Sequence, residues 1–323
     1  MTHGFPAEHH DVTFDGYRFR SGETLDRIRL HYSTAGTPVR DSRGEIVNAV
    51  LMLHWTGGSH ESMQSEEFGL SLYGPGKPLD LANHYLIFPD NLGHGASSKP
   101  SDGLRARFPR YGYRDMVELQ HQLVTETLGI RKLRSIVGIS MGGMHAWMWA
   151  ELWPEAVAGI VPVVAMPMRI SGRNLVWRRI VARQIRTDPE WLAGEYRSSP
   201  RGFREAYTIF RMMLHGVQQL QDLIPDVAAA DGFVESAAAQ GAGIDANDLL
   251  YALEASEDYA PVPERILTKV LAINFADDEF NPVLMVKPLI YRVPNGRLVL
   301  LSGGAGHQSH GLASRWAERV REL

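Results

Sequence analysis

One short motif near the middle of the chain most constrains what it can fold into. The pattern Gly-x-Ser-x-Gly occupies residues 138–142; the apolar run from Ile136 leads into it, and the helix-favouring run Met144–Trp149 follows. A serine placed between a strand and a helix lies on a tight, strained turn, where glycines keep side chains away from crowded backbone. The helix N-terminus then directs a backbone N–H at any oxyanion formed beside the serine. The motif predicts a nucleophilic Ser140, and a glycine-rich packing turn is the non-catalytic alternative.

Length and composition restrict the classes of protein that can carry this motif. The 323 residues suffice for one large domain, or for a domain with a sizeable insertion. A net charge of −4 gives no reason to expect nucleic acid or an anionic membrane as a partner. The absence of cysteine excludes disulfides, thiolate catalysis and Cys-ligated zinc. The first ten residues carry no signal-peptide pattern and no apolar run is long enough to span a membrane, so we expect a cytoplasmic enzyme.

The order of apolar runs predicts an α/β fold with a mainly parallel central sheet. Two alternating runs, residues 14–20 and 27–32, are joined by a glycine-bearing turn and predict an antiparallel pair at a sheet edge. Short apolar runs, typical of strands buried on both faces, occupy residues 49–53, 85–89, 136–139, 158–164, 269–275 and 296–301. Helix-favouring stretches separate most of these runs, and a last helix is expected to end at Leu323. Such alternation is typical of a doubly wound sheet flanked by helices.

The alternation of strands and helices breaks between residues 168 and 262. This section favours helices and contains no convincing buried strand. An insertion of this length after one strand of an α/β sheet predicts a helical lid, or cap, over a site. The predicted division is therefore a core of residues 1–167 and 263–323, with residues 168–262 as the lid.

Titratable residues follow the last two predicted strands. Asp277 and Asp278 come after residues 269–275, and His307 and His310 come after residues 296–301. Together with Ser140 they give the chain order serine, acid, histidine that serine hydrolases of the α/β type share. An imidazole must take the serine proton, and a carboxylate must fix the imidazole tautomer and stabilise its charged form. Loops at the carboxyl ends of the strands meet above such a sheet, so the three segments can converge.

Several segments spread over nearly the whole chain also resemble the homoserine O-acetyltransferase family. They are Ser21–Leu25, His54-x-x-x-Gly58, Ser140–Met144, Ala182 through Tyr196, Asp245-Ala246-Asn247 and Asp277-x-x-Phe280-x-Pro282. The resemblance implies an α/β-hydrolase fold with a helical lid, a Ser-Asp-His triad and a covalent acyl-serine intermediate. It also implies a homodimer formed through the lids.

Carried over position by position, the resemblance assigns roles to residues of this chain. The nucleophile is Ser140, the histidine is His307, and the acid is Asp277 because Phe280 and Pro282 keep the family's spacing from it; Asp278 is the fallback. The oxyanion donors are the backbone N–H groups of Met141 and Thr56, with Trp55 as the one-residue alternative to Thr56.

The remaining candidate residues receive structural or pocket roles. His310 is expected to be a helix cap or a surface residue, and Asp90 and His94 are expected to close a turn. Three side chains are predicted to line the substrate pocket: Trp55, Met144 and Tyr207. The apolar residues near the serine suggest a modest pocket and a short acyl group.

Three departures from the family pattern bear on the reaction. Gln308 stands where the transferases have an aspartate that holds the homoserine amine, and Gly243-Ile244 stands where they have Arg-Phe. The transferases have an arginine near the position of Ala206 that helps bind the homoserine carboxylate, and here Tyr207 follows the alanine. Each charge-assisted contact of this kind contributes about 1.5–3 kcal/mol. Without them water becomes the expected acyl acceptor, so the leading hypothesis is a carboxylic-ester hydrolase acting on a small-molecule ester.

Other functions stay open at this point. The main alternative is an acyltransferase that passes an acyl group from acyl-CoA to a small acceptor, and amide or C–C bond hydrolysis is a further one. A protein that keeps the fold and binds a ligand without turnover is an alternative from a different class. No cofactor and no metal are expected, because the thirteen histidines form no HExxH motif, and His307-x-x-His310 is the only helix-like pair near the site.

Overall fold

An eight-stranded sheet forms the centre of the computed structural model, which describes residues 6–323. The strand order is β1-β2-β4-β3-β5-β6-β7-β8; β2 runs antiparallel to β1 and β4, and the other neighbouring pairs are parallel. The strands are β1 (Glu8–Arg18), β2 (Thr24–Ala35), β3 (Ala49–Leu53), β4 (Tyr85–Pro89), β5 (Ser135–Ile139), β6 (Gly159–Val163), β7 (Lys269–Phe275) and β8 (Gly296–Leu301). The predicted mainly parallel sheet with an antiparallel edge is confirmed. Residues 1–5, part of the N-terminal stretch considered above, lie outside the described residues.

The middle of the sheet is buried on both faces, which explains why its strands read as continuous apolar runs. Every residue of β3, β5 and β6 is buried. Alternate residues enter opposite cores, as the twofold period of a strand requires. Leu51 and Ile136 lie in one hydrophobic cluster, while Val50 and Val137 lie in the other.

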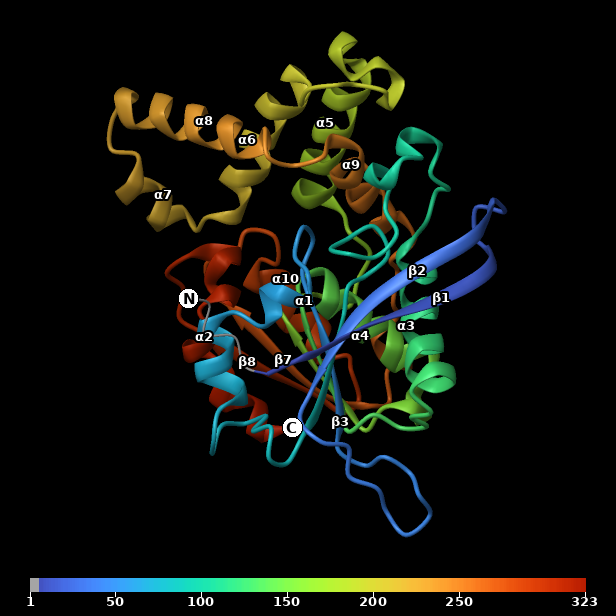
Figure 1. Cartoon of the computed structure of the whole chain (residues 1–323). Coiled ribbons are helices and arrows are strands. Elements are labelled where there is room, and N and C mark those ends of the chain that lie inside the picture. The colour runs from blue at the N-terminus through green and yellow to red at the C-terminus, as the bar shows by residue number, and fades with distance from the viewer. Residues whose placement is uncertain (1–5) are drawn as a thin grey trace.

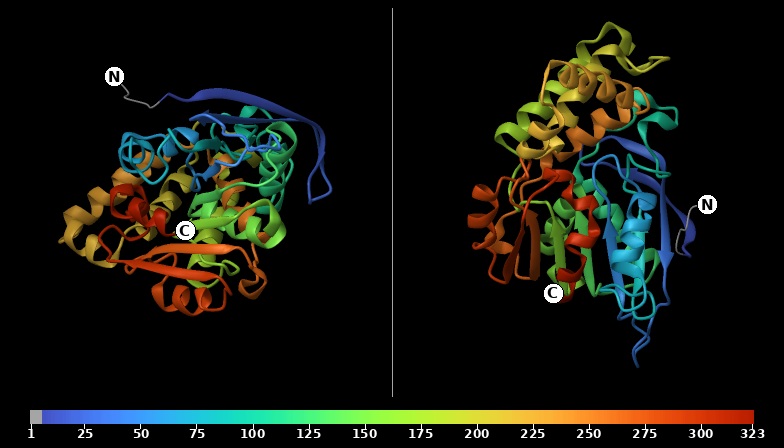
Figure 2. Two further views of the ribbon diagram at one scale, coloured as in Figure 1. Left: turned by 90° about the horizontal axis from the view of Figure 1, so that it is seen from below. Right: turned by 90° about the vertical axis from the view of Figure 1, so that its left-hand side faces the viewer.

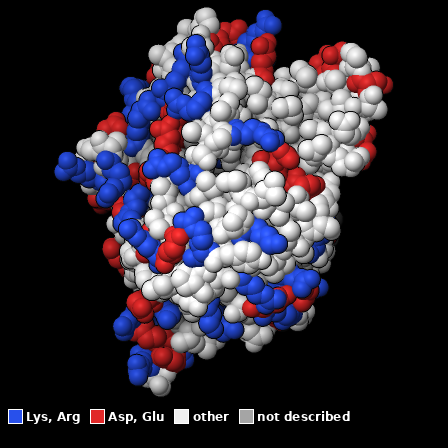
Figure 3. Space-filling view, turned by 180° about the vertical axis from the view of Figure 1, so that it is seen from behind, with Lys and Arg blue, Asp and Glu red and all other residues white. Residues whose placement is uncertain are grey.

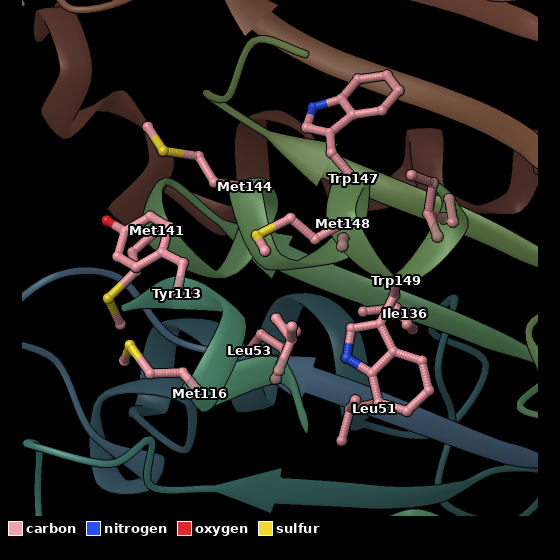
Figure 4. Close-up of a cluster of buried hydrophobic side chains, with 14 of the residues drawn as sticks. Leu51, Leu53, Tyr113, Met116, Ile136, Met141, Met144, Trp147, Met148 and Trp149 are labelled. Atoms are coloured by element: carbon pink, nitrogen blue, oxygen red, sulfur yellow. The ribbon is translucent and has the colours of Figure 1, made fainter. Parts of the chain in front are cut away.

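Helices cover both faces of the sheet. The first cluster is completed by α3 (Tyr113–Gln122), α4 (Met141–Leu152) and α10 (Val283–Ile290). Figure 4 shows part of it, where Trp147 and Trp149 of α4 lie with residues of β3, β5 and α3. The second cluster is completed by α1 (His60–Met63), α2 (Glu66–Phe68) and the C-terminal segment. Because α4 is buried on nearly all sides, the serine turn that precedes it is held on a rigid support.

The C-terminal segment differs from its prediction. Instead of one α-helix, the chain forms short 3₁₀ turns at Ala313–Arg315 and Ala317–Glu322, with Trp316 fully buried between them. The Trp316 indole donates a hydrogen bond to the His310 carbonyl at 2.9 Å. The segment therefore ties the His307 loop to the second core.

A run of helices lies between β6 and β7. It contains α5 (Gly172–Thr187), α6 (Arg201–Leu214), α7 (Val217–Leu223), α8 (Val227–Gly241) and α9 (Ala246–Glu254), and no strand is described between Val163 and Lys269. The insertion has its own hydrophobic cluster, to which Trp177, Phe203 and Leu250 belong. Phe280, from the loop after β7, joins that cluster and stacks on Trp177 at 5.2 Å between ring centroids. Figures 1 and 2 show the insertion above one end of the sheet.

The surface of the described chain is mixed in charge. Figure 3 shows basic and acidic side chains interspersed over the back of the molecule, and neither sign covers that face alone. Among the helices of residues 6–323, none combines the length and the apolar character that crossing a membrane requires.

Candidate active site

Ser140 lies on a strained turn between β5 and α4. Its backbone angles are φ 52° and ψ −109°, a left-handed conformation that side-chain-bearing residues rarely adopt. Two hydrogen bonds hold the turn: the Ser140 N–H donates to the Val163 carbonyl at 2.9 Å, and the Gly142 N–H donates to the His54 carbonyl at 3.0 Å. The turn is therefore fixed to the ends of β6 and β3, as predicted for a nucleophile elbow.

The glycines around Ser140 are required by close backbone contacts. A Cβ atom at Gly138 would lie 2.1 Å from the Gly142 carbonyl oxygen, and a Cβ atom at Gly142 would lie 2.2 Å from the Leu53 carbonyl oxygen. At Gly143 it would lie 2.7 Å from the Ala165 side chain. Each distance is far inside van der Waals contact, so the reason expected for Gly138 and Gly142 is confirmed, and the same crowding applies at Gly143.

Three buried side chains form a hydrogen-bonded chain that starts at Ser140. Its Oγ lies 2.8 Å from His307 Nε2, and His307 Nδ1 lies 2.9 Å from Asp278 Oδ2. With Nδ1 protonated, the imidazole donates to the carboxylate and accepts the serine proton at Nε2. Asp278 Oδ1 also accepts the N–H groups of Phe280 and Asn281. Burial opposes ionisation of Asp278, but the positive charge and hydrogen bond of His307, with the donors of Asn281, keep its pKa below the ordinary value.

The prediction that Asp277 pairs with the histidine is wrong. Asp277 Oδ2 instead accepts the backbone N–H groups of Gly304 at 2.7 Å and Gly306 at 3.1 Å. Both residues lie in the turn that follows β7, and this turn directs the two adjacent carboxylates to different parts of the histidine loop. The fallback residue, Asp278, occupies that place, and Asp277 holds the loop that carries His307.

The glycine-rich loop after β3 lies beside Ser140. Buried His54 fixes its shape: Nε2 accepts the Asn91 N–H at 3.1 Å, and Nδ1 lies 2.8 Å from the Trp55 carbonyl oxygen. That carbonyl also accepts the Gly58 N–H at 2.9 Å, which closes a turn over Thr56. Met141, the other expected oxyanion donor, is the first residue of α4, where a backbone N–H has no acceptor within the helix.

A cavity of about 370 Å³ opens above Ser140 between the core and the helical insertion. It is lined by Trp55, Thr56, Gly57, Ser140, Trp177, Arg178, Tyr207, Phe210, Arg211, Leu214, Ile244, Leu249, Phe280, His307, Gln308, His310 and Gly311. Trp55 and Tyr207, two of the three side chains expected near the substrate, line this cavity. Met144 does not belong to it, because its side chain lines a separate neighbouring cavity of about 300 Å³.

His310 was expected to be a helix cap or a surface residue, and that prediction is wrong. It is buried, its ring lies 4.8 Å from that of Trp55, and its Nδ1 lies 2.6 Å from the His307 carbonyl oxygen. Burial, together with the nearby charge of His307, lowers the pKa of His310 to about 4. At neutral pH it is therefore a neutral wall of the cavity. Asp90 and His94 do close a turn, with Asp90 accepting the Ala96 N–H at 2.8 Å and His94 Nδ1 lying 3.1 Å from the Leu92 carbonyl.

Two arginines of the insertion line the cavity and were missed by sequence reasoning. Arg178 is 5% exposed, and the described residues provide it with neutral partners: Asn174 Oδ1 at 3.0 Å, Ser256 Oγ at 3.3 Å and the face of Trp177. Burial lowers the pKa of its guanidinium, which nearby Tyr113 partly offsets. Arg211 lies one helical turn after Tyr207 on α6. The only sequence signal was the position of both residues on helices with an apolar face.

Three of the residues at or near the transferase charge positions line the cavity, and Gly243 does not. Gln308 lines the cavity, and its amide lies 3.2 Å from His215 Nε2. Ile244 and Tyr207 also line it. The described lining contains two arginines and no aspartate or glutamate. A positively charged ammonium group would therefore find no opposite charge there.

The fold, with a serine on a strained turn hydrogen-bonded to a histidine and an acid, places the protein in the class of alpha/beta hydrolases. A profile of the alpha/beta hydrolase fold family matches residues 48–312, and the chain belongs to that family.

More specific relatives are similar over much of the chain. A probable acyltransferase of Methanothermobacter thermautotrophicus is 29% identical over 95% of this chain and 94% of its own length. A homoserine O-acetyltransferase of Geotalea uraniireducens is 36% identical over 62% of this chain. That match spans 57% of the transferase, little more than half its length. The resemblance to homoserine O-acetyltransferases noted in the sequence is thereby confirmed.

Solved structures share the fold at low sequence identity. Esterase E22 superimposes with a TM-score of 0.85 at 21% identity, covering 98% of this chain and 99% of its own. The homoserine O-acetyltransferase of Bacillus anthracis gives a TM-score of 0.85 at 20% identity, over 98% and 97% of the two chains. An acetylester hydrolase of Corynebacterium glutamicum gives 0.83 at 19% identity, over 98% and 95%. Esterases and transferases share the fold equally, so the fold alone does not choose between the two reactions.

Proposed function

We propose that this protein is a serine esterase that hydrolyses a small carboxylic ester through an acyl-serine intermediate. The observation that carries the proposal is the chain of hydrogen bonds from Ser140 through His307 to Asp278, beside a cavity of about 370 Å³ that Ser140 and His307 line. In this account residues 168–262 act as the lid of the cavity.

The proposed reaction has two halves. His307 Nε2 takes the Ser140 proton as Oγ attacks the ester carbonyl, and the backbone N–H groups of Thr56 and Met141 stabilise the oxyanion. The imidazolium, held by Asp278, then protonates the departing alcohol and leaves an acyl-serine. A water molecule activated by the same histidine attacks the acyl-serine, the acid leaves, and Ser140 regains its proton.

The charges of the cavity support water rather than homoserine as the acyl acceptor. Homoserine carries an ammonium group, and the described cavity lining offers Gln308 but no carboxylate to receive it. An ammonium group that binds in the cavity without a counter-charge loses about 1.5–3 kcal/mol of binding free energy for each missing charge-assisted contact. A neutral ester, or one with a negative substituent near Arg178 and Arg211, meets no such penalty.

Acyl transfer is the second candidate, and one observation favours it. Arg178 and Arg211 place two guanidinium groups in the cavity, which could receive a carboxylate of an acyl acceptor. A relative of similar length is named a probable acyltransferase, and another, matched over 57% of its length, a homoserine O-acetyltransferase. Such an acceptor would be an anionic alcohol rather than an amino acid.

Replacement of the nucleophile tests the proposed function. Ser140→Ala should abolish the hydrolysis of 4-nitrophenyl acetate while leaving the thermal unfolding midpoint within a few degrees of the wild type. Met168→Leu, which alters a side chain outside the cavity over Ser140, is the matched control and should retain full activity. Activity that survives in Ser140→Ala would refute the assignment of the nucleophile.

We also propose that the protein forms a homodimer through the insertion. Large apolar side chains are exposed there: Val217 at 59%, Leu223 at 53%, Val227 at 77% and Val234 at 50%. Exposed apolar side chains gathered on α7 and α8 are typical of a contact surface. Sedimentation velocity should give twice the chain mass, and Val227→Glu with Val234→Glu should give the single chain mass.

A further inference from the structure

Three histidines meet on the antiparallel side of the sheet, on elements away from Ser140. His9 lies on β1, His31 on β2 and His60 at the start of α1, and Figures 1 and 2 show the beginning of β1 passing close to the α1–α2 region. One ring nitrogen of each lies within 4.8 Å of one nitrogen of each of the others. His9 Nδ1 lies 3.4 Å from His31 Nε2.

The strand register brings these side chains together. Asp11 of β1 lies directly across from His31 of β2, and His9 lies two residues before Asp11. Residues two apart on a strand share a face, so His9, Asp11 and His31 project from the same side of the hairpin. His60 reaches that side from the other direction, with its ring centroid 4.8 Å from that of His31 and 5.2 Å from that of His9.

Two of the three imidazoles are already oriented by carboxylates. His31 Nδ1 lies 3.0 Å from Asp11 Oδ1, and His60 Nδ1 lies 2.9 Å from Asp90 Oδ2. A proton on each Nδ1 leaves the Nε2 lone pair free, which is the form in which histidine binds a metal. Carboxylates in this position fix the tautomer and raise the basicity of metal-bound histidines in proteins. Asp90 is itself held by the backbone N–H groups of His60 and Ala96.

The geometry and the donor set fit one class of ion. Two nitrogens bound tetrahedrally to zinc at about 2.0–2.1 Å lie about 3.3 Å apart, close to the separation of His9 and His31. A shift of the exposed His9 side chain can close its distance to His60, and the nitrogens of His31 and His60, which lie within 4.8 Å, come together if one of these two rings also turns. Three imidazoles select zinc, nickel or copper over magnesium and calcium, which prefer oxygen ligands. His31 is 13% exposed at its side chain and Asp11 53%, so an ion can enter from solvent.

We propose that His9, His31 and His60 bind one zinc ion, with water at a fourth position. The ion would join the β1–β2 hairpin to the first residue of α1. The loop that carries Thr56 ends at that point, since Ser59 is the N-cap of α1. Zinc that binds the folded chain and not the unfolded one would raise the free energy of unfolding by an amount that grows with the logarithm of the free zinc concentration above the dissociation constant.

Calorimetric titration of zinc chloride into tag-free, chelator-treated, full-length protein tests the proposal. We expect one zinc per chain, at least tenfold weaker binding in His9→Gln and in His31→Gln, and binding about 10–100-fold weaker in Asp11→Asn. The matched control is His10→Gln, because the His10 ring stacks on Tyr32 on the opposite face of the hairpin and should leave the affinity unchanged. Magnesium chloride should produce no binding heat.

A second measurement separates this site from zinc bound elsewhere, including at His307. Zinc should raise the thermal unfolding midpoint of the wild type and of His10→Gln, but not of His9→Gln, whose exposed side chain can be replaced without disturbing the core. Equal zinc affinity in the wild type, His9→Gln and His31→Gln would overturn the proposal, as would the absence of stoichiometric binding to the wild type. In either case the three rings form only a hydrogen-bonded cluster.

Discussion

The carboxylates of Asp277 and Asp278 bind two different parts of the segment that carries His307. Asp278 faces the imidazole, with 2.9 Å between its Oδ2 and Nδ1. Asp277 faces the backbone just before the histidine and accepts the N–H groups of Gly304 and Gly306. One residue therefore orients the ring and stabilises its positive charge, while the other orients the chain.

This division predicts unequal effects of the two amide substitutions. Asp278→Asn should lower kcat for 4-nitrophenyl acetate by about 10³–10⁴-fold, because an amide favours the wrong imidazole tautomer and cannot balance the imidazolium charge. Asp277→Asn should lower kcat by less than about tenfold, since the carbonyl oxygen of the new amide can still accept a backbone N–H. Steady-state kinetics of both variants checks this. The reverse order of effects would return the catalytic role to Asp277.

The crowding around the serine turn predicts a large loss of stability from one added methyl group. Gly142→Ala should destabilise the fold by about 1–3 kcal/mol or more, because its Cβ would meet the Leu53 carbonyl carbon and oxygen. Gly232→Ala is the matched control: it lies in α8 with no atom near its missing Cβ, and should stabilise by about 0.5–1 kcal/mol. Urea denaturation measures both changes. Equal stability of Gly142→Ala and the wild type would contradict the packing described.

Buried His310 predicts a loss of stability in mild acid. Its folded pKa of about 4 lies below the ordinary value of 6.5, so the unfolded chain takes up the proton first as the pH falls. The contribution of His310 to the free energy of unfolding is fully present above about pH 6.5 and is lost progressively toward pH 4. Between pH 7 and pH 5 the uptake of this proton lowers the free energy of unfolding by about 2 kcal/mol.

Urea denaturation of His310→Gln at the same two pH values checks the effect. The fall in unfolding free energy between pH 7 and pH 5 should be smaller than in the wild type by about 2 kcal/mol. An identical fall in both proteins would mean that His310 does not titrate as its burial requires.

The arginines of the cavity predict a preference for substrates with a negative charge. The wild type should hydrolyse 4-nitrophenyl hemisuccinate with a higher kcat/KM than the neutral 4-nitrophenyl pentanoate of similar length. Arg178→Gln should reduce the ratio of kcat/KM for the hemisuccinate to kcat/KM for the pentanoate by about 10–100-fold, which corresponds to the loss of one charge-assisted contact. Arg179→Gln is the control, because the exposed Arg179 pairs with Glu257 and does not line the cavity over Ser140. An unchanged ratio in Arg178→Gln would remove Arg178 from substrate recognition.

The sheet and Ser140 were predictable because local sequence determines them, whereas His307 was chosen over His310 through the family resemblance. Continuous apolar runs mark strands such as Ala49–Leu53, and the glycines at 138 and 142 mark a turn too crowded for side chains. The choice between Asp277 and Asp278 was different. It depends on which way each side chain leaves the end of β7, and the spacing to Phe280 and Pro282 did not give that direction.

The residues that were missed depend on contacts between distant segments. Arg178 reads as one of several basic residues on an amphipathic helix, and only the packing of α5 on the core buries it beside the cavity. His9, His31 and His60 are separated by 22 and 29 positions, and a strand register and a helix start bring them together. Residues on different elements have no fixed spacing in the sequence, so no sequence motif identifies them.

The central claim, that water accepts the acyl group, is tested most directly by analysing the products formed from 4-nitrophenyl acetate with and without millimolar homoserine. The account predicts acetate as the only acyl product, formed at the same rate in both cases, because the described cavity offers no carboxylate to the homoserine ammonium group. O-acetylhomoserine among the products would contradict the account. It would mean that Arg178 and Arg211, with Gln308, suffice to hold an amino acid in place of water.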